Sequence, residues 1–266
     1  YALFPHMSVI ENVSYGLKMI KESKEEYTEK ALETLKLVNL EGYENRMPSE
    51  LSGGQQQRVA VARAIVLKPK VLLFDEPLSN LDAKLRRQVR EDIREIQQKL
   101  GVTTIYVTHD QEEALAISDK VIVMNNAVIA QQGSPKILYN HPKNKFVANF
   151  IGDANVAKAE VLDSSENNHK VKLAEMTVTI KSDRNLNSSI SVALRPEKII
   201  IQKDKIENSI IAKVNNASFV GSSYQYIVNS KIGKLYVVSN DTNNIFEIND
   251  DVYLTFDDKE LKILDD

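Results

Sequence analysis

Two adjacent carboxylates, Asp75 and Glu76, follow the short apolar run "VLLF" at residues 71–74. Such a run is typical of a buried parallel strand, and ligands of open α/β folds bind at the carboxyl edge of the sheet. Neighbouring side chains that leave a strand point in different directions. Asp75 could therefore assist a Mg²⁺ ion while Glu76 acts as the base or positions water in phosphoryl transfer. The alternative is that acidic residues commonly follow strands into loops, and this motif alone does not separate the two.

A histidine, His109, ends the next β-rich run, "TTIYVTH" at residues 103–109. A histidine there can donate a hydrogen bond to a phosphate oxygen and so respond to the presence of the terminal phosphate. The alternative for a lone histidine at a loop end is that backbone groups satisfy it. The other three histidines show no spacing of metal ligands: His6 and His141 lie beside prolines, and His169 is expected in a polar turn.

A serine and two glycines, Ser52, Gly53 and Gly54, precede a helical segment in "LSGGQQQR" at residues 51–58. A hydroxyl, glycine N–H groups and a helix N-terminus together form an anion site, although an ordinary serine cap would look the same. The loop G-x-x-x-x-G-K-[ST], which cradles nucleotide phosphates, does not occur in these 266 residues. The turn therefore raises the question of whose phosphate it binds.

Alternating strands and helices must position these side chains. Asp82 is expected to cap the helix "AKLRRQVREDIREIQQKL", which carries one apolar stripe and which Gly101 ends. Strand, helix and strand in that order favour a parallel, helix-covered α/β sheet. The following segment, "DKVIVMNNAVIAQQG", predicts a hairpin around Asn125-Asn126, because asparagine tolerates a positive φ.

The character of the sequence divides the chain into three parts. Residues 1–47 are expected to be helical and residues 48–152 to form an α/β core. Residues 153–266 carry short alternating segments separated by Asn, Asp, Ser and Gly, which predicts an all-β domain, a small barrel or sandwich. We place the boundary between the last two parts near Gly152.

The bulk composition indicates a globular protein. A chain of 266 residues, 42% hydrophobic and 27% charged, is long enough for two domains and a sizeable core. No apolar run approaches the ~20 residues of a membrane helix, and the first residues lack the basic start of a signal peptide. The absence of cysteine excludes disulfides and thiolate chemistry. A net charge of −3 without a strongly basic half argues against nucleic acid as a partner.

Taken together, these motifs resemble those of the ATP-binding subunits of ABC transporters. "LSGGQQQR" matches the family's signature motif, "VLLFDEP" its Walker B strand, "SNLDA" its D-loop and "VTHD" its switch histidine. "YALFPHMSVIENVSYGL" resembles the segment after the Q-loop, and "ALRPEKI" with "FVGSSYQYIV" resembles a TOBE domain, which certain importer ATPases carry. The resemblance covers the whole chain. It implies a P-loop NTPase-type parallel sheet with a helical subdomain, followed by an OB-like TOBE barrel.

The resemblance also implies roles for the site residues. ATP and Mg²⁺ would be the cofactors, with Asp75 assisting the metal and Glu76 and His109 catalytic. In the family two ATPase subunits pair head to tail, so each signature turn closes on the ATP that the other subunit holds. The remaining nucleotide contacts would come from Ser52, Gly53, Gly54, Gln55 and Asp82.

The same resemblance implies the partners and the location. A second copy would form a homodimer, permease subunits would lie in the membrane, and an extracytoplasmic solute-binding protein would act indirectly. The chain would be peripheral on the cytoplasmic face of the plasma membrane. The apolar residues Leu3, Phe4 and Met7 would either dock on the membrane partner or belong to the local core. "YALFPHMSV" and "KNKFVANFIGD" favour polyamine or ferric-iron importers among relatives that also handle sulfate, phosphonates or sugars.

The chain also departs from the family's pattern. Walker A, the aromatic residue that stacks on adenine and the Q-loop glutamine are expected upstream of Tyr1. We therefore interpret the chain as N-terminally truncated, and expect it by itself to bind ATP weakly and to hydrolyse none measurably. A binding or regulatory module without catalysis is an alternative for such a fragment. A chromosome-maintenance or DNA-repair ATPase is disfavoured, because one helix rather than a long coiled coil separates the motifs.

Overall fold

The computed structural model describes residues 3–79, 81–165 and 167–265, which belong to two compact units. The first unit ends at Ser118 and the second begins at Asp119. We expected the boundary near Gly152. The segment between Asp119 and Gly152 instead belongs to the second unit, where the guanidinium of Arg195 binds backbone carbonyls of that segment.

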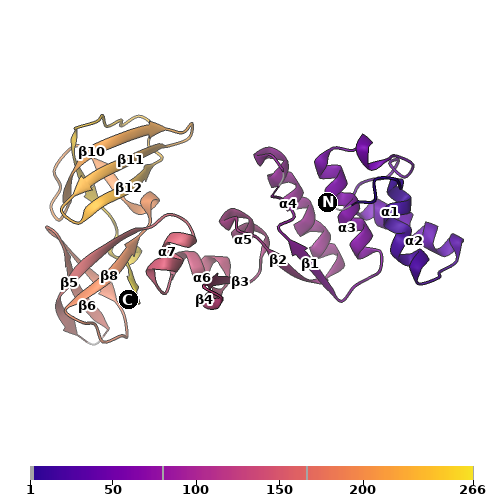
Figure 1. The fold of residues 1–266 in the computed structure, drawn as a ribbon. Helices are drawn as coiled ribbons and strands as arrows, with labels where there is room; N and C mark the ends of the chain where they lie inside the picture. Colours follow the sequence, from indigo (N-terminus) through magenta and orange to yellow (C-terminus); the bar gives the residue numbers. More distant parts are fainter. Residues whose placement is uncertain (1–2, 80, 166, 266) are drawn as a thin grey trace. The chain divides into compact units, whose positions relative to one another are not determined.

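Helices make up the N-terminal part of the first unit (Figure 1). The first two begin with capping boxes; in the first of them Glu11 accepts a hydrogen bond from the Ser8 N–H, and Ser8 accepts one from the Glu11 N–H. These boxes fix where the helices start. The elements are α1 (Val9–Met19), α2 (Lys24–Leu37), the 3₁₀ turn η1 (Pro48–Glu50) and α3 (Gly53–Ile65).

Helix α2 buries one apolar face. Ala31, Leu35 and Val38 are buried in the cluster that α2 shares with α1 and α3, whereas Leu32 is 41% exposed. Leu32 follows Ala31 directly, so the helical turn of about 100° per residue carries it off the buried face.

The segment before α1 is held by Asn12, a fully buried side chain. The Asn12 amide donates to the carbonyls of Phe4 and Met7, and its oxygen accepts from the Phe4 N–H at 2.9 Å. The Phe4 ring packs on Tyr15 with 4.7 Å between centroids, and Leu3 packs against the helical core. Local contacts therefore account for Leu3 and Phe4, although these two side chains are half-buried, as Met7 is.

A parallel pair of strands, β1 (Val71–Asp75) and β2 (Thr103–Val107), follows as predicted. Helix α4 (Ala83–Leu100) joins the two strands, and α5 (Gln111–Ile117) follows β2. In this register Asp75 at the end of β1 pairs with Val107 at the end of β2, so the carboxyl ends of both strands lie together.

Both predicted limits of α4 are confirmed. Asp82 accepts hydrogen bonds from the N–H groups of Lys84 and Leu85, and Gly101 adopts a φ of +60° at the other end. One face of the strand pair buries Leu72 and Phe74 among the helices. The buried stripe of α4 consists of Val89, Ile93 and Ile96.

The second unit begins with the predicted hairpin, β3 (Val121–Asn125) and β4 (Val128–Gly133). The turn lies one residue later than the predicted Asn125-Asn126: Asn125 ends β3 and pairs with Val128, and Asn126 and Ala127 form the two-residue turn with φ angles of +47° and +63°. Positive φ at both central residues is the requirement of a type I′ turn, which asparagine meets at low cost. Two short helices follow, α6 (Pro135–Asn140) and α7 (Lys145–Phe150).

Two five-stranded antiparallel sheets complete the second unit (Figure 1). Their strand orders are β14-β8-β5-β6-β7 and β12-β11-β10-β13-β9. Apolar side chains of both sheets form one core cluster that includes the buried Leu173, Tyr226 and Leu254, so the all-β prediction is confirmed. The remaining elements are β5 (Asn155–Ser165), β6 (Asn168–Leu173), β7 (Met176–Lys181), β8 (Ser189–Leu194), η2 (Pro196–Lys198), β9 (Ile200–Gln202), β10 (Ile210–Phe219), β11 (Tyr224–Ser230), β12 (Gly233–Ser239), β13 (Asp251–Thr255), η3 (Asp258–Glu260) and β14 (Lys262–Leu264).

One residue in this unit was predicted wrongly. His169 lies on β6, not in a turn, and is buried. Its ring nitrogens are 3.0 Å from the Ser164 hydroxyl and 2.9 Å from the Ser182 carbonyl oxygen. The polar neighbours of His169 suggested a turn, but the pairing of β5 with β6 continues through it and turns its ring inward.

Candidate functional site

Asp75, the last residue of β1, and Glu76, which follows it, lie at the carboxyl edge of the parallel pair, as predicted. The Glu76 N–H donates to the Val107 carbonyl of β2 at 2.9 Å, which extends the strand pairing by one step. Glu76 has a φ of +44°, a left-handed conformation that glutamate rarely adopts. Such a conformation costs about 1–3 kcal/mol, which the surrounding structure must offset. Residues held in it are found mainly at functional sites.

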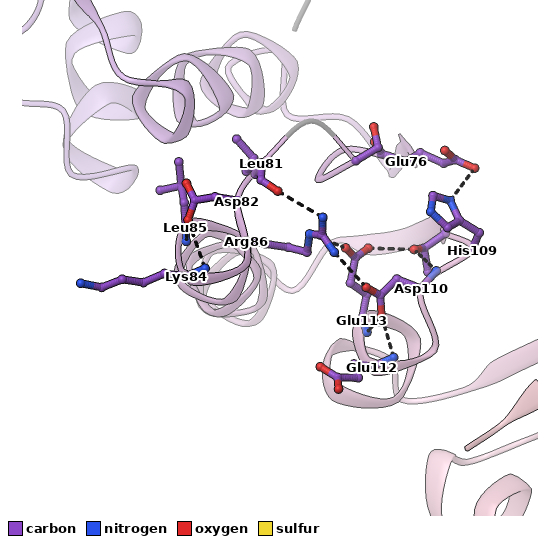
Figure 2. A network of polar contacts seen from close by, with 12 residues as sticks. Glu76, Leu81, Asp82, Lys84, Leu85, Arg86, His109, Asp110, Glu112 and Glu113 are labelled. Carbon is purple, nitrogen blue, oxygen red and sulfur yellow. Dashed lines mark hydrogen bonds and ion pairs between the residues drawn. The ribbon is translucent and has the colours of Figure 1, made fainter. Parts of the chain in front are cut away.

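Glu76 and His109 are brought together in space. The Glu76 Oε1 lies 3.2 Å from the His109 Nδ1, and both side chains are exposed, at 46% and 72% (Figure 2). A carboxylate and an imidazole at this distance can share a proton or jointly orient a water molecule. Asp75 is also exposed, and among the described residues no group of three acidic, histidine or cysteine side chains lies close enough to hold a metal ion.

A buried carboxylate supports the loop that carries His109. Glu113 of α5 is 3% exposed, and its Oε2 accepts hydrogen bonds from the Thr108 hydroxyl at 2.8 Å and the Tyr106 hydroxyl at 3.1 Å. Thr108 in turn accepts from the Asp110 N–H at 2.9 Å. Burial, and then the nearby charge of Glu113, raise the pKa of Tyr106, so its hydroxyl stays a donor.

A guanidinium from α4 completes this network. Arg86 donates to the Leu81 carbonyl at 3.1 Å and to Asp110 at 3.3 Å, and its Nε lies 3.9 Å from the Glu113 carboxylate (Figure 2). Asp110 also caps α5 by accepting from the N–H of Glu113. Leu81 precedes Asp82, and Asp110 follows His109. The Arg86 side chain therefore contacts both the segment that carries Asp82 and the segment that carries His109.

Sequence reasoning missed Arg86 and Glu113. A signal for Glu113 exists in the strand period, since Tyr106 of β2 and Thr108 just beyond its end are two apart and therefore place their hydroxyls on the same side of the extended chain. A carboxylate in the first turn of the helix that follows is the natural acceptor for that pair. Nothing in the pattern of α4 distinguishes Arg86 from its neighbour Arg87.

The serine–glycine turn forms the start of α3. Ser52 accepts a hydrogen bond from the Gln55 N–H at 3.4 Å, and the Gln55 side chain accepts from the Ser52 N–H at 2.9 Å. Gln55 is therefore engaged in a capping box. The N–H groups of Gly53 and Gly54 belong to the first helical turn, where no carbonyl of the helix reaches them. They give this turn, in which Ser52 is exposed, Gly53 half-buried and Gly54 buried, the donors of an anion site.

Close packing places the same turn beside the start of α4. A Cβ added at Gly54 would come within 2.8 Å of the Leu85 Cδ1, so α3 and α4 approach each other through a glycine. Farther along, the Arg58 Nε donates to Asp92 at 3.0 Å. The N-termini of the two helices therefore lie side by side, with Asp82 engaged in capping α4.

Comparison with known proteins identifies relatives over the whole chain. A family model described as ABC transporter matches residues 1–79, and one described as TOBE domain matches residues 192–264. An Fe(3+) ions import ATP-binding protein of Agrobacterium fabrum is 46% identical over 265 residues, which span 100% of this chain and 75% of the relative. A protein with the same description from Brucella melitensis is 46% identical over 99% of this chain and 74% of its own length.

A solved structure is also similar. It is described as cbiO1 from Clostridium perfringens, part of the ABC transporter complex cbiONQ. It shares 35% sequence identity and a TM-score of 0.48, over 51% of this chain and 53% of that chain. In the part of the chain that the structure describes, no helix has the length and apolar character needed to cross a membrane.

Proposed function

The chain belongs to the ATP-binding subunits of ABC transporters, an ATPase family, and on this premise we propose that its ATP hydrolysis powers the import of ferric iron. That this protein binds ATP and couples its hydrolysis to transport follows from the family to which it belongs. That the transported solute is ferric iron is our proposal. Two relatives that carry the ferric-iron description align with nearly the whole of this chain at 46% identity. The alternative cargo is a polyamine, which the sequence motifs left open.

The observation that carries the proposed mechanism is the contact between Glu76 and His109. We assign Glu76 to orient the water that attacks the terminal phosphate and to accept its proton. His109, 3.2 Å from Glu76, would donate a hydrogen bond to a phosphate oxygen through its other ring nitrogen. The left-handed backbone of Glu76 and its hydrogen bond to Val107 favour this assignment, because they direct an exposed carboxylate from a rigid strand end.

Mg²⁺ would be held by Asp75 together with phosphate oxygens, where it would neutralise the charge that develops during phosphoryl transfer. The donor set fits this arrangement, since Mg²⁺ in nucleotide sites needs only one or two protein carboxylates. Asp75 is exposed at the strand end and next to Glu76, which suits a ligand shared with a substrate.

The Ser52 turn is proposed to act on a different nucleotide. The N–H groups of its first helical turn and the Ser52 hydroxyl would contact the terminal phosphate of an ATP held by a second subunit. Asp82, which lies beside the Ser52 turn, would belong to the same boundary between subunits. The arrangement that supports this is the pairing of two helix N-termini, α3 and α4, whose capping residues Ser52 and Asp82 are both exposed. Gln55 would keep the turn in shape through its capping hydrogen bond.

The remaining partners follow from the same proposal. The subunit would dock on permease subunits at the cytoplasmic face of the membrane, and a solute-binding protein outside would deliver the cargo. Tyr1 to Gly16 is the segment proposed to meet the permease, with the half-buried Leu3, Phe4 and Met7 as its apolar side chains.

Replacing Glu76 by glutamine in the protein that contains this chain tests the catalytic assignment. The amide cannot take up a proton, so the turnover number for ATP should fall at least about 100-fold. Dimerisation driven by ATP should persist and can be measured by analytical ultracentrifugation. Glu112→Gln is the matched control, an exposed carboxylate three residues from His109. Turnover within about threefold of the parent in Glu76→Gln would remove Glu76 from its role.

The cargo is tested separately by uptake. Cells whose only copy carries Glu76→Gln should lose uptake of radiolabelled ferric iron and retain uptake of labelled spermidine. The reverse pattern would replace ferric iron by a polyamine without changing the assignment of the ATPase site.

A further inference from the structure

A partly buried ionic network lies beside the proposed site, and the proposed chemistry does not use it. Its centre is Glu113, whose side chain is 4% exposed and whose carboxylate faces Arg86, Tyr106 and Thr108. Burying a carboxylate costs several kcal/mol unless charges and hydrogen bonds offset the loss of water. A carboxylate kept buried at this place must have its cationic partner held close.

The cation in the network belongs to a different element from the residues that it contacts. Arg86 lies on α4, whereas Asp110 and Glu113 lie at the start of α5, 24 and 27 positions later. Arg86 also donates to the Leu81 carbonyl. Figure 2 shows the guanidinium between the Leu81 segment and the Asp110 turn, with His109 and Glu76 beyond it.

The geometry points to Arg86 as a positioning residue that couples the Leu81–Asp82 segment to His109, with Glu113 as its buried anchor. This inference rests on the proposed function, in which Asp82 lies at the boundary with a second subunit. Arg86 donates hydrogen bonds to the Leu81 carbonyl and to Asp110 at the same time, so when the Leu81 carbonyl moves, the guanidinium moves with it and Asp110 must follow to keep its hydrogen bond. Asp110 is adjacent to His109, so the shift alters the distance between His109 and Glu76.

The hydrogen bonds around Asp110 make such coupling effective. Its carboxylate receives Arg86 on one oxygen and caps α5 with the other, and its N–H donates to Thr108. Thr108 and Asp110 flank His109 on both sides, so the backbone of His109 has little freedom to move independently. In this way the arrival of the second subunit at Asp82 adjusts the histidine that faces the terminal phosphate.

The decisive variant is Arg86→Lys. Lysine keeps a positive charge near Glu113 and so preserves the fold, but a single ammonium cannot donate to Leu81 and Asp110 in the fixed fork of a guanidinium. The turnover number for ATP should fall about tenfold, a size typical of lost coupling between sites. The KM for ATP should change less than about threefold, since no atom that binds ATP is altered. Arg87→Lys, on the exposed neighbour, is the matched control.

A second pair of variants separates coupling from simple stability. Arg86→Met leaves Glu113 buried without its cation and should lower the thermal unfolding midpoint. Adding Glu113→Gln removes that uncompensated charge and should restore the midpoint, yet turnover should stay reduced because the link to Leu81 is still missing. Restoration of both midpoint and turnover would show a structural role only and overturn the inference.

The outcomes also distinguish this inference from the proposed function. If Glu76→Gln abolishes hydrolysis while Arg86→Lys turns over like the parent, the coupling is refuted and the proposed function stands. If Glu76→Gln hydrolyses ATP normally, the proposed chemistry fails first. Hydrogen exchange of residues 106–113 gives a readout that needs no turnover: ATP-driven pairing should slow it in the Glu76→Gln protein and leave it unchanged when Arg86→Lys is added.

Discussion

Replacing Arg195 by methionine should detach the α6–α7 segment from the β-sheets of the second unit. The buried guanidinium donates to four backbone carbonyls, at 2.8 to 3.0 Å for its shortest bonds, and stacks over the Tyr139 ring with 4.1 Å to the centroid. The accepting carbonyls belong to Tyr139, Ala148, Gly152 and Asp153.

The magnitude follows from these contacts. Hydrogen bonds to a charged group contribute about 1.5–3 kcal/mol each, and the contributions are not additive when one side chain makes them all. Methionine fills much of the volume but donates nothing, so several carbonyls lose their partner together. We expect the free energy that holds the α6–α7 segment in place to fall by about 3–5 kcal/mol, the cost found when one partner of a buried ion pair is removed.

Hydrogen–deuterium exchange is the appropriate assay, because the chain has two units and need not unfold in one step. Exchange of residues 135–153 should become roughly 100-fold faster or more, since each 1.4 kcal/mol is a factor of ten, while exchange in α3 stays unchanged. Arg184→Met is the control: this arginine is 49% exposed in a surface pair with Asp265, which contributes about 1 kcal/mol at most. Equal effects of the two substitutions would refute the reasoning.

Two further predictions concern local structure. Gly152→Ala should destabilise the second unit by about 2–3 kcal/mol, because φ is +80° and the new Cβ would lie 2.8 Å from the Tyr139 ring. Urea denaturation can measure this loss of stability. Hydrogen bonds from the Ser8 backbone and side chain hold the pKa of Glu11 below its ordinary value of 4.5. The ionised carboxylate therefore stabilises α1 fully above pH 4.5, and this stabilisation is lost as the pH falls through the lowered pKa. Acidification should therefore speed amide exchange in α1 more in the parent than in Glu11→Gln, and parallel pH profiles would contradict the capping role.

Features set by local chemistry were predictable from the sequence. Asp82 and Gly101 marked the ends of α4, because a side-chain acceptor and a left-handed residue are what the two helix ends require. Asn126 marked the β3–β4 turn for the same conformational reason. Asp75 was correctly placed at a strand end, because a short apolar run followed by charge identifies where a strand leaves the sheet. The expectation that the run is buried was only half right, since Leu72 and Phe74 are buried but Val71 and Leu73 are exposed.

Features set by contacts between distant residues were not predictable. Gly152 was interpreted as a domain boundary, but its carbonyl binds Arg195, 43 positions later, and its left-handed backbone makes room for the Tyr139 ring. Glycine therefore marked a tight turn inside the unit. Arg86 and Glu113 escaped notice for a similar reason, since their partners lie on other elements and no short spacing reveals the pairing.

The proposed site combines exposed side chains with buried support. Glu76 and His109 are 46% and 72% exposed, whereas the Glu113 side chain behind them is 4% exposed. An exposed side chain loses conformational entropy when it is held in one position, so its own contacts position it weakly. The placement of both groups must come mainly from their backbone, which the strand pairing at Val107 and the network at Asp110 define. Removing Glu76 should therefore abolish the proposed chemistry, whereas loosening Arg86 should only reduce its rate.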